Sequence, residues 1–97
     1  MRPRVPWMSD VDRVILEIAE GRKRATSTAD VWVNWPEDVI DRPTDQHVHR
    51  RMRALNEHGL LREEGSKRGW YVLTDLGDKY LNDPDATIDD FVDEADD

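Results

Sequence analysis

Residues 44–61, with the sequence TDQHVHRRMRALNEHGLL, contain one helix together with the signals that begin and end it. Thr44 can cap the first turn, and Asp45 places a negative charge at the positive end of the helix dipole. Gly59 is the expected terminator, because glycine adopts the left-handed conformation that commonly ends a helix. The stretch therefore predicts a helix over residues 44–58.

This helix is predicted to have one apolar side and one cationic side. Val48, Met52 and Leu55 follow the spacing i, i+4 and i+7, so they form a stripe that faces the core. Other positions are polar or basic, and the helix period places several of them opposite the stripe. The opposite face carries Gln46, His49, Arg50, Arg53 and Glu57, with His47 and Arg51 at its flanks.

The concentration of cations on this helix contrasts with the whole chain, whose 97 residues carry a formal net charge of −8. Residues 1–74 have 13 Lys and Arg against 12 Asp and Glu, a net charge of +1. Residues 75–97 have one lysine against ten acids, a net charge of −9. The acidity is therefore mainly a property of the C-terminal end.

The acidic and basic residue types are also biased, with 15 Asp to 7 Glu and 11 Arg to 3 Lys. This composition resembles that of proteins from halophiles that accumulate salt, in which short hydrated carboxylates dominate the surface. The alternative is a mesophilic domain with an acidic tail. We favour the halophilic interpretation because acids also crowd the first predicted helix and residues 36–43.

Residues 1–8 are expected to form an extended basic arm, residues 9–82 one domain, and residues 83–97 an acidic tail. A first helix should end near Gly21 with Val11, Ile15 and Ile18 on its apolar face, and a second should stop before Pro36. The candidate N-caps are Ser9 or Asp10 for the first helix and Ser27 or Thr28 for the second.

After the central helix, two short runs, LLRE and WYVLT, contain strand-forming residues. Gly65 and Gly69 lie between them and allow the backbone to reverse, which predicts a β-hairpin with a basic tip. A last short helix is expected within TDLGDKYL, capped by Thr74 or Asp75. The segment after Asn82 could form one more amphipathic turn or be disordered.

The order helix, helix, helix, strand, strand, helix resembles the winged helix-turn-helix domain. Two motifs carry the resemblance: RALNEHGLL at residues 53–61 and YVLTDLGDKYL at residues 71–81. They are similar to those of MarR/PadR-like regulators and, most closely, of haloarchaeal regulators related to a halophage repressor. The connection at residues 34–43 is longer than in a tight helix-turn-helix. The implied fold is α+β and mainly α, with three helices, a two-stranded wing hairpin and a C-terminal helix.

The resemblance implies a sequence-specific, double-stranded-DNA-binding transcriptional regulator, a repressor that acts as a homodimer. Residues 44–58 would lie in the major groove, and the wing at residues 64–69 would touch the backbone or minor groove. The expected base-contacting residues are Gln46, His49, Arg50 and Arg53. The expected backbone-contacting residues are His47, Arg51, Lys67, Arg68, Arg22, Lys23 and Arg24.

Less specific interpretations remain open for the same residues. Charged residues on a helix are usually only its solvated face, and the same fold also serves as a protein–protein interaction module. The acidic tail could also occupy the basic helix and inhibit DNA binding. The first two alternatives predict a chain that does not read DNA sequence through residues 44–58, whereas the third predicts a DNA binder inhibited by its own acidic tail.

We expect no enzyme activity, cofactor or metal site. No nucleophile is paired with a base, and His47 and His49 point about 200° apart on a helix, so they cannot share one ion. The four tryptophans are expected to fill the core and its edges rather than line an effector pocket. The start of the chain lacks the apolar segment of a signal peptide, and no run is long enough to cross a membrane, so we expect a cytoplasmic protein.

Overall fold

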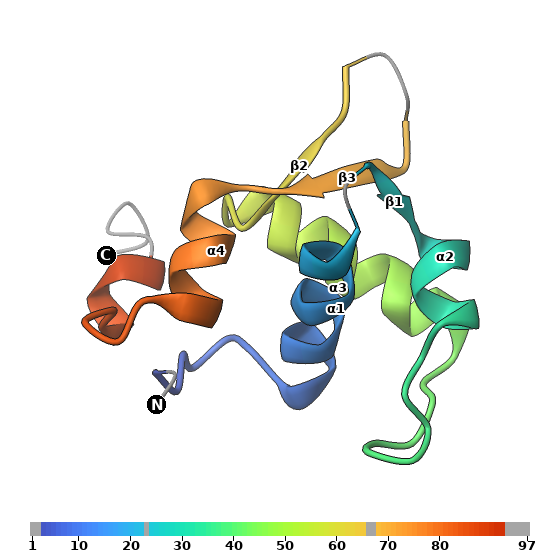
Figure 1. The fold of residues 1–97 in the computed structure, drawn as a ribbon, viewed down its shortest axis with the longest axis horizontal. Helices are drawn as coiled ribbons and strands as arrows, with labels where there is room; N and C mark the ends of the chain where they lie inside the picture. The colour runs from blue at the N-terminus through green and yellow to red at the C-terminus, as the bar shows by residue number, and fades with distance from the viewer. Residues whose placement is uncertain (1–2, 23, 66–67, 93–97) are drawn as a thin grey trace.

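The computed structural model describes residues 3–22, 24–65 and 68–92. Helices lie below a small sheet in Figure 1, and the hairpin between the last two strands projects from the top of the molecule. The elements are α1 (Asp10–Gly21), β1 (Thr26–Ser27), α2 (Thr28–Val33), α3 (Asp45–Glu57), β2 (Leu61–Glu63), β3 (Trp70–Leu73), α4 (Asp75–Asn82) and the 3-10 turn η1 (Ile88–Phe91).

The predicted α+β, mainly helical architecture is confirmed, and so is the hairpin. The sheet has one more strand than expected: its order is β1-β3-β2, with both pairs antiparallel. Thr26 in β1 is paired with Tyr71 and is almost fully buried. A two-residue strand is too short to show an alternating pattern, so the sequence did not predict it.

The caps determine where the helices begin, and they agree with the sequence signals. Ser9 precedes α1 and Ser27 precedes α2, each in a reciprocal capping box with the acid three residues later. The side chain of Thr44 accepts a hydrogen bond from the backbone N–H of His47, and the side chain of Thr74 begins α4 in the same way. Local chemistry therefore places all four helices.

The apolar stripe of α3 is confirmed, because Val48, Met52 and Leu55 are fully buried. Helix α1 is buried more completely than a one-sided amphipathic helix, since it packs against α2, α3, α4 and β3. Ile15 is buried, as expected for the apolar face, together with Val14, Leu16 and Ala19, whereas Val11 and Ile18, also expected on that face, are half-buried.

The long connection between α2 and α3 is held by two tryptophans, which fixes where α3 begins. The indole N–H of Trp32 donates to the carbonyl of Pro43 at 3.0 Å, and that of Trp35 donates to the carbonyl of Ile40 at 3.0 Å. Arg42 lies 4.5 Å above the Trp32 ring. Besides filling space in the domain, as predicted, Trp32 and Trp35 each donate a hydrogen bond that holds the connection.

Both the described part of the arm and the turn η1 pack onto the domain. Val5 in the arm and Phe91 in η1 are buried, and the indole N–H of Trp7 donates to the carbonyl of Phe91 at 2.9 Å. The Phe91 ring meets Tyr80 edge-on, with 5.4 Å between the ring centroids. The core therefore continues past the boundaries drawn at residues 8 and 83.

Candidate nucleic-acid interface

Helix α3 exposes five polar side chains on the side opposite its buried stripe: the acid Glu57 and four hydrogen-bond donors. Gln46, His49, Arg50 and Arg53 are all exposed, and their spacing of i, i+3, i+4 and i+7 places them on one face. Each can donate hydrogen bonds, and the two arginines carry planar guanidinium groups. The structure thus brings together the residues expected to read bases.

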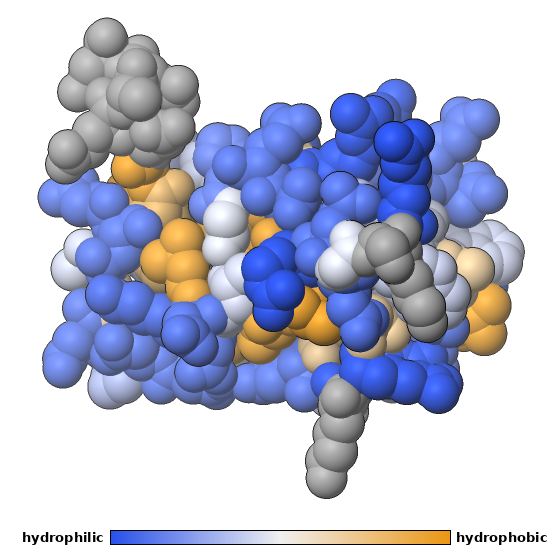
Figure 2. Space-filling view, turned by 90° about the horizontal axis from the view of Figure 1, so that it is seen from above, coloured by the Kyte–Doolittle hydropathy of each residue, from blue (hydrophilic) through white to orange (hydrophobic). Residues whose placement is uncertain are grey.

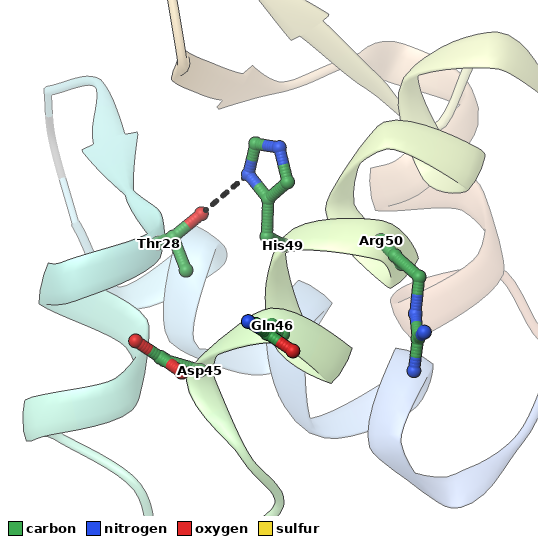
Figure 3. A pocket seen from close by; sticks show the side chains of 5 residues that line it. All are labelled: Thr28, Asp45, Gln46, His49 and Arg50. Carbon is green, nitrogen blue, oxygen red and sulfur yellow. Dashed lines mark hydrogen bonds between the residues drawn. The ribbon is translucent and has the colours of Figure 1, made fainter.

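A hollow of about 500 Å³ lies where the start of α3 meets α2. Figure 3 shows Thr28 and His49 turned toward each other across it, with Arg50 pointing away. The Thr28 hydroxyl lies 3.4 Å from Nδ1 of His49 and 3.7 Å from the sulfur of Met52. Thr28 was considered only as a helix cap in the sequence analysis, so its contact with α3 is a new element of the site. The hollow is lined by Thr28, Asp45, Gln46, His49 and Arg50.

A second hollow, of about 520 Å³, lies between α3 and the hairpin. It shares His49 with the first, so the two are adjacent along one side of α3. Its cations are Arg53 from α3 and Arg68 from the hairpin, both exposed. The remaining lining residues are Glu63, Gly69 and Tyr71.

The acid in this second hollow has a structural partner. One carboxylate oxygen of Glu63 accepts a hydrogen bond from the backbone N–H of Gly69 at 3.1 Å, and Gly69 has a φ of 80° that favours glycine. Burial raises the pKa of the Tyr71 hydroxyl, with Glu63 adding to the rise and Arg53 opposing it. The Tyr71 hydroxyl therefore stays neutral and can donate or accept a hydrogen bond in this second hollow.

His47 lies at the flank of the exposed face, where it was expected, and is half-buried. A guanidinium nitrogen of Arg50 lies 3.4 Å from its Nδ1. Arginine cannot accept a hydrogen bond, so a neutral His47 in this contact carries its proton on Nε2. The contact draws Arg50 toward the side of α3 on which His47 lies.

Arg51 differs from its expected role as a phosphate contact. Its Nε and one terminal nitrogen donate to the two carboxylate oxygens of Asp12 at 2.8 and 2.9 Å, and that nitrogen also donates to the carbonyl of Trp7 at 3.0 Å. The helix period gives the reason: position 51 is about 60° from Val48, on the side that packs against α1. The prediction for Arg51 is therefore wrong.

The basic connection after α1 is also used partly within the chain. The guanidinium of Arg22 lies 3.3 Å from a carboxylate oxygen of Asp30, the acid in the first turn of α2, so its expected phosphate contact is replaced by an ion pair. Arg24 is exposed and lines a separate hollow of about 170 Å³ with Glu20. The expected contacts of Lys23 and Lys67 lie outside the described residues.

Within the described residues, the acidic segment after α4 (residues 83–92) does not cover α2. Asp90 in η1 pairs with Lys79 in α4 at 3.4 Å, and Figure 1 places this segment beside α4, across the molecule from α2. Figure 2, seen from the side on which the hairpin projects, is mostly hydrophilic, and much of its hydrophobic surface lies on the α4 side. Asp93 and the residues that follow it lie outside the described residues.

Within residues 3–22, 24–65 and 68–92, His, Asp and Glu side chains form no group that could hold a metal ion. In the same residues, no helix is long and apolar enough to cross a bilayer.

Three helices, an antiparallel hairpin packed beside them and an exposed polar face on the third helix define a winged helix-turn-helix domain, the class of a DNA-binding regulator. The chain belongs to the winged helix-turn-helix phage repressor family, whose pattern matches residues 1–93. A similar solved structure is that of a PhiH1 repressor-like protein from Haloarcula marismortui, with a TM-score of 0.69 and 34% sequence identity. The match covers 84% of this chain and 85% of that one. No curated protein matches the sequence.

The family and this relative agree with the resemblance found in the two sequence motifs and with the halophilic composition. The structure explains why position 77, in the motif at residues 71–81, is a glycine. Gly77 lies in the first turns of α4, where an added Cβ would collide with the carbonyl of Leu60 and the side chain of Leu73. The glycine therefore lets α4 pack directly onto the turn that follows α3.

Proposed function

We propose that this chain is a sequence-specific repressor of transcription that binds double-stranded DNA through α3 and the hairpin. The observation that carries the proposal is the division of α3 into two faces. Val48, Met52 and Leu55 bury one face completely, while Arg50 and Arg53 remain exposed on the other. A helix held in this way can present its outer side chains to the major groove.

The exposed residues have the chemistry for direct readout of bases. Arginine can make paired hydrogen bonds to O6 and N7 of guanine, which suits Arg50 and Arg53, and Gln46 can make the equivalent pair to adenine. His49 can donate or accept a single hydrogen bond, depending on its tautomer. Each well-formed bidentate pair contributes about 1–3 kcal/mol of discrimination against the wrong base.

The hairpin supplies contacts of a second kind. Arg68 lies near its tip and, with Arg53, lines the hollow between hairpin and helix. A hairpin beside a recognition helix can reach the phosphate backbone or the minor groove. Arg68 therefore adds affinity for DNA of any sequence, whereas Arg53 adds preference for one sequence.

The functional unit is a homodimer. Two domains related by a two-fold axis would place their recognition helices in successive major grooves, about 34–36 Å apart on the DNA. The operator should then contain two inverted half-sites about one helical turn apart. Cross-linking and sedimentation of the chain with and without such a duplex would measure the stoichiometry.

High salt shapes the expected mode of recognition. In molar salt the Debye length falls to about 3 Å, and competition from counterions weakens phosphate contacts. A regulator from a halophile must therefore obtain more of its specificity from hydrogen bonds to bases and from shape complementarity. This expectation fits a site with few exposed cations and several neutral donors.

Selection of bound duplexes from a random pool at high salt tests the proposal. The wild-type chain should enrich one sequence with inverted half-sites. Arg62→Ala controls for the loss of an arginine outside the proposed interface, because Arg62 is an exposed arginine on β2 that lines neither α3 hollow. This variant should enrich the same sequence as the wild type. A pool in which no sequence is enriched after repeated rounds would refute sequence-specific binding.

A further inference from the structure

Arg51 makes a charged polar contact between α3 and two other segments of the domain. Its guanidinium group donates to both carboxylate oxygens of Asp12 and to the carbonyl of Trp7, all at 2.8–3.0 Å. The hydrogen bond to Asp12 raises the pKa of the arginine above its already high value, so the group stays charged. Three hydrogen bonds to two separate segments fix both the position and the plane of the guanidinium.

Asp12 has a second partner, which makes the ion pair rigid. Its side chain is 0% exposed, and Oδ2, one of the oxygens that bind Arg51, also accepts from the backbone N–H of Ser9 at 2.8 Å as part of the α1 capping box. The carboxylate therefore cannot rotate without losing the cap of α1. Arg51 is consequently anchored to the beginning of a helix rather than to a mobile surface acid.

Trp7 completes the arrangement from the arm. Its indole ring stacks on His58, the residue that caps the C-terminal end of α3, with 3.8 Å between the ring centroids and 13° between the planes. The carbonyl of Trp7 accepts from Arg51, near the middle of α3. Trp7 thus contacts α3 at two points about two turns apart, which restricts rotation of the helix.

The rotation of α3 determines where the exposed side chains point. Neighbouring residues on a helix are about 100° apart, so a fixed direction for Arg51 also fixes the direction of Arg50 and, two positions on, of Arg53. Hydrophobic packing tolerates small rotations, because apolar contacts are not directional. Charged hydrogen bonds do not tolerate them, because their strength depends on alignment.

We infer that Asp12, Arg51 and Trp7 are positioning residues for DNA reading, which orient the exposed face of α3 without touching the DNA. This inference rests on the proposed DNA-binding function. Loss of the Asp12–Arg51 pair reduces discrimination among DNA sequences. It leaves the number of phosphate contacts unchanged, because the guanidinium of Arg51 is engaged inside the domain.

The test compares Arg51→Met with Arg68→Met in the full chain. For each variant, the Kd is measured for the selected duplex and for an unrelated duplex at a series of salt concentrations. Arg51→Met should lower the ratio of the two affinities about tenfold and leave the salt dependence of binding to the selected duplex unchanged. Arg68→Met should make the negative slope of log K against log salt shallower by about 0.9 for each bound subunit, the value for one phosphate contact, and keep the ratio.

Asp12→Asn is a second variant that keeps a side-chain oxygen for the cap of α1 while removing the charge that holds Arg51. If circular dichroism shows that Arg51→Met is unfolded at the assay temperature, Asp12→Asn is used instead. The same decrease in the ratio of the affinities for the selected and the unrelated duplex is expected. Unchanged discrimination in the folded variant would overturn the inference, as would a slope for Arg51→Met that falls as far as for Arg68→Met. A wild-type chain that binds both duplexes equally would refute the proposed function itself, and the inference with it.

Discussion

Phe91→Ala should destabilise the whole domain, although Phe91 lies in the segment that the sequence suggests is an acidic tail. The ring is only 3% exposed and packs edge-on against Tyr80. A buried phenylalanine covers about 150–250 Å². At about 25 cal/mol per Å², its burial contributes at most about 4–6 kcal/mol relative to an extended unfolded chain.

The expected loss on truncation is about 3 kcal/mol, at the low end of the range for buried phenylalanine, because η1 is a single 3-10 turn of four residues that can relax around the truncated side chain. Val92, the residue after Phe91, is 42% exposed, so Val92→Ala is the matched control. It should lower the free energy of unfolding by less than about 0.5 kcal/mol. Urea denaturation followed by circular dichroism at constant salt measures both values.

Equal midpoints for Phe91→Ala and Val92→Ala would refute this reasoning, because they would mean that η1 detaches without affecting the core. The result also determines how autoinhibition by the acidic end should be tested. Deletion of residues 83–97 removes a core side chain, whereas deletion of residues 93–97 alone leaves Phe91 in place. Only the shorter deletion separates an electrostatic effect on DNA binding from a loss of stability.

Gly77→Ala should lower stability by about 1–3 kcal/mol in urea denaturation, because the new methyl group meets the carbonyl of Leu60 and overpacks the contact between α4 and the preceding turn. The Tyr71 hydroxyl should ionise above the usual tyrosine pKa of about 10, because its pKa is raised in the folded state. The contribution of Tyr71 to the free energy of unfolding is therefore present below pH of about 10 and is lost as the pH rises further. Asp90 has a lowered pKa, mainly because it accepts the backbone N–H of Thr87. Its contribution is therefore present above pH of about 4 and is lost as pH falls through the lower folded value.

Each of these predictions has a control within the chain. Gly21→Ala places a methyl group where nothing lies within 4 Å, so it should not destabilise the domain as Gly77→Ala does. In an absorbance titration, Tyr71→Phe should remove one tyrosine from the part of the curve above pH of about 10, and an unchanged curve there would contradict the assignment. Asp90→Asn should make η1 less sensitive to acid; an unchanged acid transition would show that this carboxylate is not responsible.

The sequence predicted the parts of the fold that depend on local chemistry. The caps at Thr44 and Thr74 and the buried stripe of α3 follow from side-chain types and helical spacing, and the structure confirms them. The strand β1 could not be found in this way, because it exists only through its pairing with β3. The burial of Phe91 likewise depends on Tyr80 and on the arm, which are distant in sequence.

The site shows the same limit. Helical spacing correctly grouped Gln46, His49, Arg50 and Arg53 on one exposed face, because that grouping depends only on the period of the helix. Helical spacing also placed Arg51 at the flank of this face, but a flank position about 60° from Val48 can turn toward DNA or toward α1. The partner that makes its inward position favourable, Asp12, is 39 residues away and could not be identified from spacing.

The most direct test of the central claim is a competition between the selected duplex and a scrambled one for wild type and Arg53→Ala at molar salt. If α3 reads bases, wild type should prefer the selected duplex, and Arg53→Ala should lose about 1–3 kcal/mol of that preference, roughly 5- to 150-fold, while it retains its fold. Arg53→Ala with the full preference of the wild type would contradict the account, because the exposed face of α3 would then not be the surface that recognises sequence.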